Sequence, residues 1–131
     1  MAETEAPPQI GTICWSEVLT PDAGKATAFY TSLFGWKTEQ MDMGPGGTYT
    51  MFKAQDQMAG GLMALPEEAK SHGAKPTWMA YITVADVDAS TKKAESLGAK
   101  VCTGPQEIPN MGRFSIITDP TGATVGLYQK T

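Results

Sequence analysis

Histidine and cysteine, two residue types that commonly bind metal ions, are scarce in this sequence: the 131 residues include one histidine and two cysteines. Cys14 and Cys102 lie far apart and form no CxxC pair, so a zinc site or a disulfide is the weaker explanation for them. We expect two buried free thiols, as in proteins of the reducing cytoplasm. The histidine, His72, falls in a polar segment and is expected to be a solvated loop residue.

Basic residues and long apolar runs are also few. Lys and Arg number 10 against 14 Asp and Glu, a net charge of −4 at pH 7. The basic residues are scattered, which argues against nucleic acid or an anionic membrane as a partner. No apolar run approaches the ~18 residues that a membrane span needs. Residues 1–9 have no apolar stretch behind basic residues, so we expect a disordered tail, no signal peptide and a cytoplasmic location.

The length and the hydrophobic content of 41% are typical of one folded domain, which we expect over residues 10–131. The first half predicts a strand at residues 11–19 and then a helix, which Thr20 is expected to cap and Gly35 to end. Apolar residues at helical spacing predict that one face of this helix is buried. They are Ala26, Phe29, Tyr30, Leu33 and Phe34. Three further strands are expected at residues 36–43, 48–54 and 58–64.

The second half repeats this order after a polar connection at residues 65–77. Its helix is expected to begin after Asp86, which suits an N-cap. Asp, Pro, Thr and Gly at residues 119–122 favour a tight turn between the last two strands. The four strands are expected at residues 78–84, 100–106, 114–118 and 123–128.

Residue matches between the halves indicate a duplication. A glycine ends each predicted helix, and Gly61 in the fourth strand corresponds to Gly126 in the last. The two modules cover residues 11–64 and 78–129, and each reads strand, helix, strand, strand, strand. Two such βαβββ modules predict an α+β fold in which a curved sheet has helices on its convex face and a cleft on its concave face.

Several short segments follow one another along the two halves: Pro21-Asp22, Phe29-Tyr30 with Leu33-Phe34-Gly35-Trp36, Val84-Ala85-Asp86-Val87-Asp88, Asp119-Pro120-Thr121-Gly122 and Val125-Gly126-Leu127. Together they resemble the vicinal oxygen chelate superfamily, which includes glyoxalase I, bleomycin-resistance proteins and extradiol dioxygenases. The resemblance covers residues 11–129. It implies a small-molecule ligand in the cleft and a homodimer, but it implies no single reaction.

In metal-dependent members of that family, four His, Glu or Gln side chains from the first and last strands of each module hold a divalent ion. The corresponding positions here are Trp15, Gly61, Met79 and Gly126. None offers a donor to a hard metal, because indole has no free lone pair, glycine has no side chain and a thioether is too soft. We therefore expect no metal and no other cofactor. A register shift of two residues would bring Glu17 into the first position, but one carboxylate does not make a metal site.

Aromatic and apolar side chains are expected to line the cleft instead: Trp15, Phe52, Met79, Tyr81 and Tyr128. The two glycines would leave room on its floor for a flat ligand. Trp and Tyr are favoured both in ligand sites and at subunit contacts. The alternative is therefore that these side chains pack on one another or on a partner subunit.

Glu17 is the one acidic residue expected to point into the cleft. A buried carboxylate needs a partner or takes up a proton, so Glu17 is a candidate general base. The alternative is an ion pair with Lys53 or Arg113. Arg113 is expected in a loop over the cleft, at residues 110–113, where it meets an anionic ligand or is solvated.

Three functions remain open. The first is a metal-free binder of an aromatic or apolar small molecule. The second is a lyase, isomerase or dioxygenase that uses Glu17 as a general base or holds a metal through non-standard ligands. The third is a structural or regulatory dimer domain, which predicts that the cleft aromatics are buried in a subunit contact.

Overall fold

The computed structural model describes residues 9–43, 47–65, 67–71 and 73–131. The expected tail, apart from Gln9, lies outside the described residues, as does His72. Within the described part of the chain, no helix is both long enough and apolar enough to cross a bilayer.

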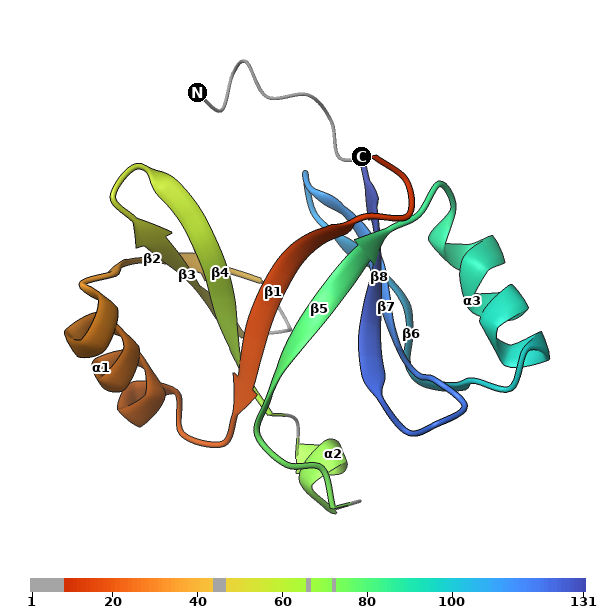
Figure 1. Cartoon of the computed structure of the whole chain (residues 1–131), viewed down its shortest axis with the longest axis horizontal. Helices are drawn as coiled ribbons and strands as arrows, with labels where there is room; N and C mark the ends of the chain where they lie inside the picture. Colours follow the sequence, from red (N-terminus) through yellow and green to blue (C-terminus); the bar gives the residue numbers. More distant parts are fainter. Residues whose placement is uncertain (1–8, 44–46, 66, 72) are drawn as a thin grey trace. The chain divides into compact units, whose positions relative to one another are not determined.

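The elements follow one another in the order of a duplicated module (Figure 1). They are β1 (Ile13–Thr20), α1 (Ala23–Phe34), β2 (Lys37–Asp42), β3 (Thr48–Ala54), β4 (Gln57–Ala64), α2 (Glu67–Ser71), β5 (Thr77–Thr83), α3 (Val87–Ser96), β6 (Lys100–Ile108), β7 (Gly112–Thr118) and β8 (Thr124–Lys130). The strands hydrogen bond in the order β2-β3-β4-β1-β5-β8-β7-β6. The α+β class and the tandem βαβββ order are confirmed. The short helix α2, inside the predicted connection, was not expected.

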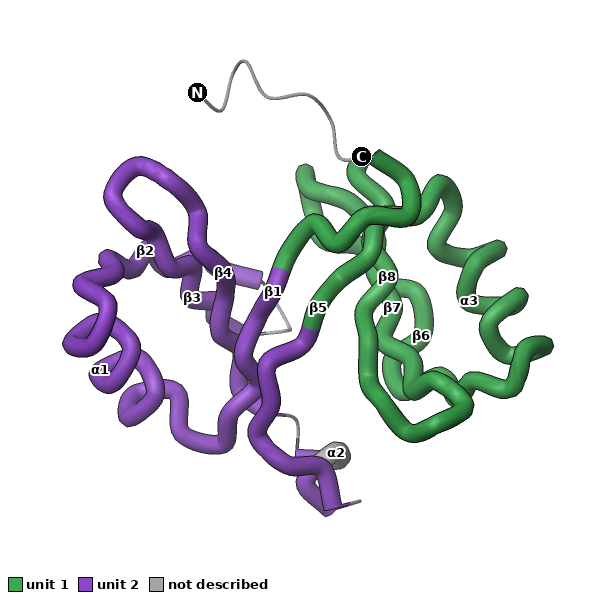
Figure 2. Tube along the Cα trace, viewed as in Figure 1, with its two compact units in different colours: residues 1–15, 80–131 green, residues 16–79 purple. Residues whose placement is uncertain are grey.

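The chain divides into two compact units (Figure 2). Unit 1 comprises residues 1–15 and 80–131, and unit 2 comprises residues 16–79. The division passes through β1 and β5, so Trp15 belongs to unit 1 and Met79 to unit 2.

In unit 2, β2, β3 and β4 pair in antiparallel fashion, and β1 joins β4 in parallel. Helix α1 packs on one face of these strands. The contact is a core of Val18, Phe52 and Leu62, against which Ala26 and Tyr30 of the helix lie. Because side chains alternate along a strand, the residues next to Val18, Phe52 and Leu62 face away from α1.

The start of α1 differs from the expectation. Asp22, not Thr20, is the N-cap, and its carboxylate accepts a hydrogen bond from the backbone N of Lys25 at 3.0 Å. Thr20 is still part of β1, where its Oγ1 accepts from the Asp22 backbone N at 3.1 Å. Gly35 ends the helix as expected, with a left-handed φ of 71°.

The apolar stripe of α1 is only partly buried. Ala26 and Tyr30 pack against the core, whereas Phe29, Leu33 and Phe34 remain 58%, 58% and 55% exposed. The apolar residues cover a wider part of the helix surface than the part that contacts the core. The residues outside that contact therefore stay exposed to solvent.

In unit 1, β6, β7 and β8 are antiparallel, and β8 joins β5 in parallel. Helix α3 packs on one face through Val87 and Thr91, and Thr91 Oγ1 lies 2.8 Å from Ser115 Oγ of β7. Asp86 caps the helix as expected. Leu97, which follows the last helical turn, is 67% exposed.

Both cysteines are free, as expected, but they are not both buried. Cys14 is half-buried, and its Sγ lies 3.6 Å from the Tyr81 carbonyl oxygen. Cys102 is exposed, because β6 is the last strand in the order and one of its faces meets solvent.

Candidate functional site

Glu17 lies on the face of unit 2 that is turned away from α1. In β1 it is the register partner of Gly61 in β4, and its side chain is 2% exposed. Tyr49 of β3 donates a hydrogen bond from its hydroxyl to Glu17 Oε1 at 2.8 Å. The buried carboxylate thus has a neutral donor beside it, which lowers the cost of removing it from water.

The Tyr49 ring fills the space above Gly61. A Cβ at position 61 would collide with the Tyr49 hydroxyl and ring carbons. In unit 2, the room that glycine was expected to leave for a ligand therefore holds a side chain of the protein. Tyr49 was not singled out from the sequence. The alternation of side chains along β3 could have identified it, because Tyr49 lies three residues before Phe52 and therefore on the opposite face of the strand.

Phe52 lies in the core beneath α1 and has 0% exposure. Its ring centroid is 5.0 Å from that of Trp36 and 6.0 Å from that of Tyr30. This packing accounts for the whole side chain, so Phe52 is not part of the binding surface proposed below.

Unit 1 contains a matching tyrosine and glycine. Tyr81 of β5 is the register partner of Gly126 in β8, and a Cβ at position 126 would collide with its ring. Tyr81 is 6% exposed, and its ring meets that of Phe114 edge to face with centroids 6.4 Å apart. In both units, a tyrosine ring therefore packs against the glycine of the repeat.

Thr83 and Tyr128 extend this face of unit 1. They are register partners, each two residues beyond the Tyr81–Gly126 pair. The Tyr128 hydroxyl donates to the Met111 carbonyl oxygen at 2.9 Å. Burial raises the pKa of Tyr128, and nearby Cys14 adds to the shift.

The hydroxyl of Thr83 is the unusual group on this face. Its Oγ1 is buried and has no hydrogen-bond partner in the described part of the chain. Leaving a buried hydroxyl unpaired costs about 1–3 kcal/mol. A group of this kind on an otherwise aromatic face is a point at which a ligand oxygen or nitrogen would be held.

We use the name "unit 1 surface" for Tyr81, Thr83, Phe114 and Tyr128. Alternation places them opposite α3, because Ser115, next to Phe114, bonds to that helix. Of the five residues expected to line a ligand site, the structure thus brings together Tyr81 and Tyr128. Sequence reasoning missed Thr83 and Phe114, although both lie in the predicted alternating strands.

The other two expected lining residues are placed differently. Trp15 is half-buried in β1 at the edge of unit 1. Met79 is 2% exposed and belongs to unit 2.

Metal donors do not gather in the described residues. No group of three or more His, Cys, Asp or Glu side chains is placed there to hold an ion. The positions that the family resemblance implies for ligands hold a tryptophan, a methionine and two glycines. The residues described therefore do not fit the divalent ion of the metal-dependent relatives.

Arg113, considered above as a partner for Glu17, lies in β7 and pairs within unit 1. Its Nη2 lies 2.8 Å from Asp88 Oδ1, and its Nη1 lies 3.5 Å from Glu107 Oε1. The hydrogen bond to Asp88 is the main reason that the pKa of Arg113 is raised. The turn that precedes β7 covers residues 109–111.

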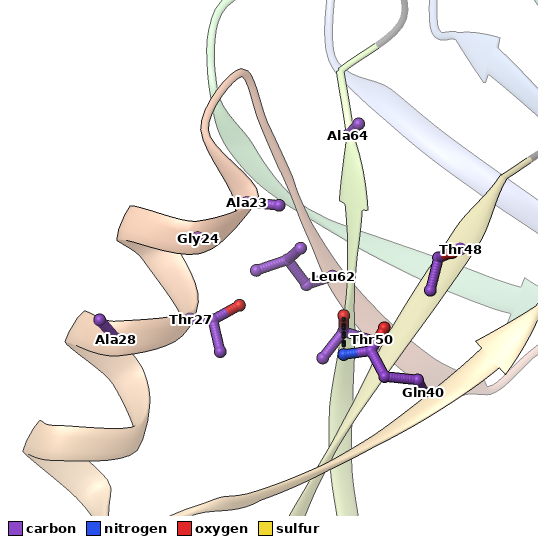
Figure 3. A pocket seen from close by; sticks show the side chains of 9 residues that line it. All are labelled: Ala23, Gly24, Thr27, Ala28, Gln40, Thr48, Thr50, Leu62 and Ala64. Carbon is purple, nitrogen blue, oxygen red and sulfur yellow. Dashed lines mark hydrogen bonds between the residues drawn. The ribbon is translucent and has the colours of Figure 1, made fainter.

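A pocket of about 460 Å³ lies between α1 and the strands of unit 2 (Figure 3). Small and polar residues line it: Ala23, Gly24, Thr27, Ala28, Gln40, Thr48, Thr50, Leu62 and Ala64. Gln40 Nε2 donates to Thr50 Oγ1 at 3.1 Å across its sheet side. The pocket is on the α1 face, opposite Glu17, and no residue expected from the sequence to have a functional role borders it.

The family model described as the Glyoxalase/Bleomycin resistance protein/Dioxygenase superfamily matches residues 10–127. "Putative glyoxylase CFP32" of Mycobacterium tuberculosis is 41% identical over 120 residues, covering 91% of this chain and 46% of that protein. "Anthracycline biosynthesis protein DnrV" of Streptomyces peucetius is 30% identical over 131 residues, covering 92% and 47%. The chain spans about half the length of the curated relatives that it matches.

Among solved structures, methylmalonyl-CoA epimerase from Mycobacterium tuberculosis is similar, with a TM-score of 0.62 and 17% identity. The match covers 100% of this chain and 96% of that one. At this identity the likeness shows a shared fold.

Proposed function

The chain belongs to the Glyoxalase/Bleomycin resistance protein/Dioxygenase superfamily, and from this premise we propose that it is a metal-free binder of a planar aromatic or apolar small molecule, with the unit 1 surface as its site. The observation that carries the proposal is the buried, unpartnered hydroxyl of Thr83 among aromatic rings. Ligand sites are typically apolar with a few convergent polar groups, and this surface has that composition.

The aromatic part of the surface favours a flat ligand. The rings of Tyr81 and Phe114 already meet edge to face. Phe114 and Tyr128 are register partners on neighbouring strands, so their side chains stand side by side. Rings arranged in this way stack with, or meet edge to face, an added ring. Trp15, half-buried at the edge of the same unit, is expected to extend the contact.

The polar part of the surface favours a ligand that accepts a hydrogen bond. The Tyr128 hydroxyl already donates to Met111, which leaves Thr83 as the donor with no protein acceptor in the described structure. A carbonyl or hydroxyl on a fused aromatic system would satisfy it. The name of the relative DnrV points the same way, because anthracyclines are flat, oxygenated ring systems.

The proposal is tested by titrating the purified protein with 1,8-dihydroxyanthraquinone, a planar probe with ring oxygens, by calorimetry. Thr83→Val keeps the shape and removes the hydroxyl, and we expect it to weaken binding about two- to tenfold, as for one lost hydrogen bond. Phe114→Ala is expected to weaken binding by about tenfold, because a stacked ring is removed. Phe29→Ala is the matched control, since Phe29 is an exposed aromatic of unit 2.

Stability measurements separate loss of the site from loss of the fold. Thr83→Val should unfold at the same urea concentration as the wild type or a higher one, because an unpaired buried hydroxyl is removed. If Thr83→Val and Phe114→Ala both bind the probe with the affinity of the wild type, the site is refuted. A stoichiometric divalent ion in the purified protein, found by elemental analysis, would refute the metal-free part.

The Glu17–Tyr49 pair supports a second candidate, an isomerase or lyase with Glu17 as general base. The hydrogen bond from Tyr49 fixes one carboxylate oxygen in a buried position, which is how a catalytic base is oriented. A substrate would reach Glu17 after the Tyr49 ring moves off Gly61. Glu17 would then accept a proton from carbon next to a carbonyl group.

Deuterium uptake from D₂O into methylglyoxal, followed by NMR, tests this candidate. Exchange that is lost in Glu17→Gln, slowed in Tyr49→Phe and unchanged in Glu39→Gln would support it, because Glu39 is an exposed carboxylate on β2. Equal exchange rates in Glu17→Gln and wild type would exclude Glu17 as the base.

A further inference from the structure

In unit 1, a pair of hydroxyl groups closes the contact between the helix and the strands. Thr91 is the fifth residue of α3, and its Oγ1 lies 2.8 Å from Ser115 Oγ of β7. Thr91 is 4% exposed and Ser115 is 0% exposed. Val87, the first residue of α3, is also 0% exposed. The start of this helix is therefore packed closely on its strands, and each hydroxyl has the other as a partner.

The residues that correspond to these in unit 2 are Ala23, Thr27 and Thr50. Ala23 and Thr27 are the first and fifth residues of α1. Thr50 of β3, like Ser115 of β7, is the register partner of the leucine that follows the glycine of the repeat. The duplication therefore predicts that Thr27 and Thr50 would also meet and close the start of α1 on its strands.

The pocket of about 460 Å³ lies at this place instead (Figure 3). Ala23 and Thr27 line it from the helix, and Thr50 lines it from the strands. Alanine occupies the position that a valine fills in α3, so less side chain reaches across. Thr50 Oγ1 accepts a hydrogen bond from Gln40 Nε2 at 3.1 Å, and none joins it to Thr27 in the described part of the chain. Two hydroxyls that would satisfy each other are thus separated by open space.

The lining of the pocket favours a neutral ligand that carries hydroxyl groups. None of the described residues that line it is charged, so an ionic ligand would lose its hydration without gaining a counter-charge. The hydroxyls of Thr27 and Thr50 and the amide of Gln40 can each donate and accept hydrogen bonds. Leu62, which is 2% exposed, gives the floor an apolar part. A sugar ring has the matching combination, because hydroxyls surround its edge and its C–H face is apolar.

We propose that this pocket binds a small, neutral, polyhydroxylated molecule of the monosaccharide class, whose hydroxyl groups bridge Thr27 and Thr50. Its volume lies within the range of about 300–1,000 Å³ that is typical of small-molecule sites. Ala23, Gly24 and Ala28 on its rim are exposed, so a ligand can enter from solvent. The site lies in unit 2 and does not depend on the ligand proposed for the unit 1 surface.

Titration of the isotope-labelled full chain with methyl β-D-glucopyranoside, followed by heteronuclear NMR, tests the proposal. The side-chain amide of Gln40 gives its own signal, so binding is observed in the pocket itself. We expect this signal and the backbone amides of Thr27 and Thr50 to shift until the site is saturated. Thr27→Val keeps the shape of the side chain and removes the hydroxyl, and it should weaken binding about two- to tenfold.

Ala23→Leu places a larger side chain in the pocket, and we expect the saturable shifts to be lost. Ala89→Leu is the matched control: the same substitution at an exposed alanine in the first turn of α3 should leave binding unchanged. Both alanines are exposed, so neither substitution should prevent folding, and circular dichroism checks this.

A wild type without saturable shifts at the Gln40 signal overturns the proposal. Binding of wild-type affinity in both Ala23→Leu and Thr27→Val overturns it as well, because the ligand would then lie elsewhere. Tighter binding of gluconate, an anionic relative of the probe, would overturn the neutral ligand class. None of these results bears on the anthraquinone titration, which reports on Thr83 and Phe114 in unit 1.

Discussion

At the scale of single residues, the two glycines of the repeat are covered in two different ways. The ring over Gly61 comes from Tyr49 in the third strand of its module, and it is held by a hydrogen bond to Glu17. The ring over Gly126 comes from Tyr81 in the neighbouring parallel strand. Both modules thus have a glycine at the corresponding position, but the tyrosine ring that packs against it comes from a different strand in each module.

Gly126→Ala is expected to destabilise the protein by about 1–3 kcal/mol, because the new Cβ overlaps the near side of the Tyr81 ring, which cannot move freely. Gly61→Ala should also destabilise the protein, since the new Cβ overlaps the Tyr49 hydroxyl, whose hydrogen bond to Glu17 would be lost if the ring moved. Urea unfolding followed by circular dichroism measures both. Gly104→Ala is the control, because a Cβ added there would have no atom within 4 Å of it. Equal stability of Gly126→Ala and Gly104→Ala would contradict the packing described.

Tyr128 makes the protein sensitive to alkaline pH. Burial, with a contribution from Cys14, raises its folded-state pKa above the ordinary value of about 10. The folded state then holds the phenol proton more tightly than the unfolded state does. This contribution to stability is fully present below the unfolded pKa and is lost as pH rises through the folded one.

Ultraviolet titration of the tyrosines checks this prediction. The absorbance component that Tyr128→Phe removes should titrate above pH ~10, and the variant should lose less stability than the wild type as pH rises further. A component that titrates below the ordinary tyrosine range would show that Tyr128 is not buried as described.

At the scale of elements, the turn between β7 and β8 is built by one carboxylate. Asp119 Oδ1 accepts hydrogen bonds from Thr121 Oγ1 at 2.7 Å, Thr121 N at 2.8 Å and Ala123 N at 3.1 Å. Gly122 has a φ of 104°, a conformation that other residues rarely adopt. The side chain therefore closes the hairpin before the ladder of β7 and β8 begins.

Asp119→Ala should lower the melting temperature, and more so than Asp119→Asn, which keeps an acceptor oxygen. The Thr121 hydroxyl, followed by the Ala123 amide, lowers the pKa of Asp119 below its ordinary value. The stabilisation is therefore present above the unfolded pKa and is lost as pH falls through the lower folded value. Melting curves of wild type and Asp119→Ala should converge in acid. A constant difference down to the lowest pH would contradict this role.

At the scale of the whole molecule, the two modules share their order of elements but divide their surface chemistry. The helix of one is charged and the helix of the other carries exposed rings, while the chain as a whole is acidic.

The sequence by itself determined the elements of the two modules and their order, but not the short helix α2. The positions of turn-forming residues, the caps and the alternation of apolar residues are local properties, and they identified two βαβββ modules, the end of α1 at Gly35 and the turn at Asp119. They also predicted that the positions which the family resemblance implies for metal ligands hold no hard donors. These inferences succeed because φ restriction, capping and strand parity act within a few residues of the chain.

The tertiary structure decided which side chains meet. Phe52 and Tyr49 are three residues apart in one strand, and only the position of α1 places one in the core and the other beside Glu17. The rings over the glycines come from other strands, and the exposure of Leu33 depends on how wide a strip of α1 the core covers. Contacts of this kind arise between segments far apart in the chain, where close packing and not local preference selects the neighbour.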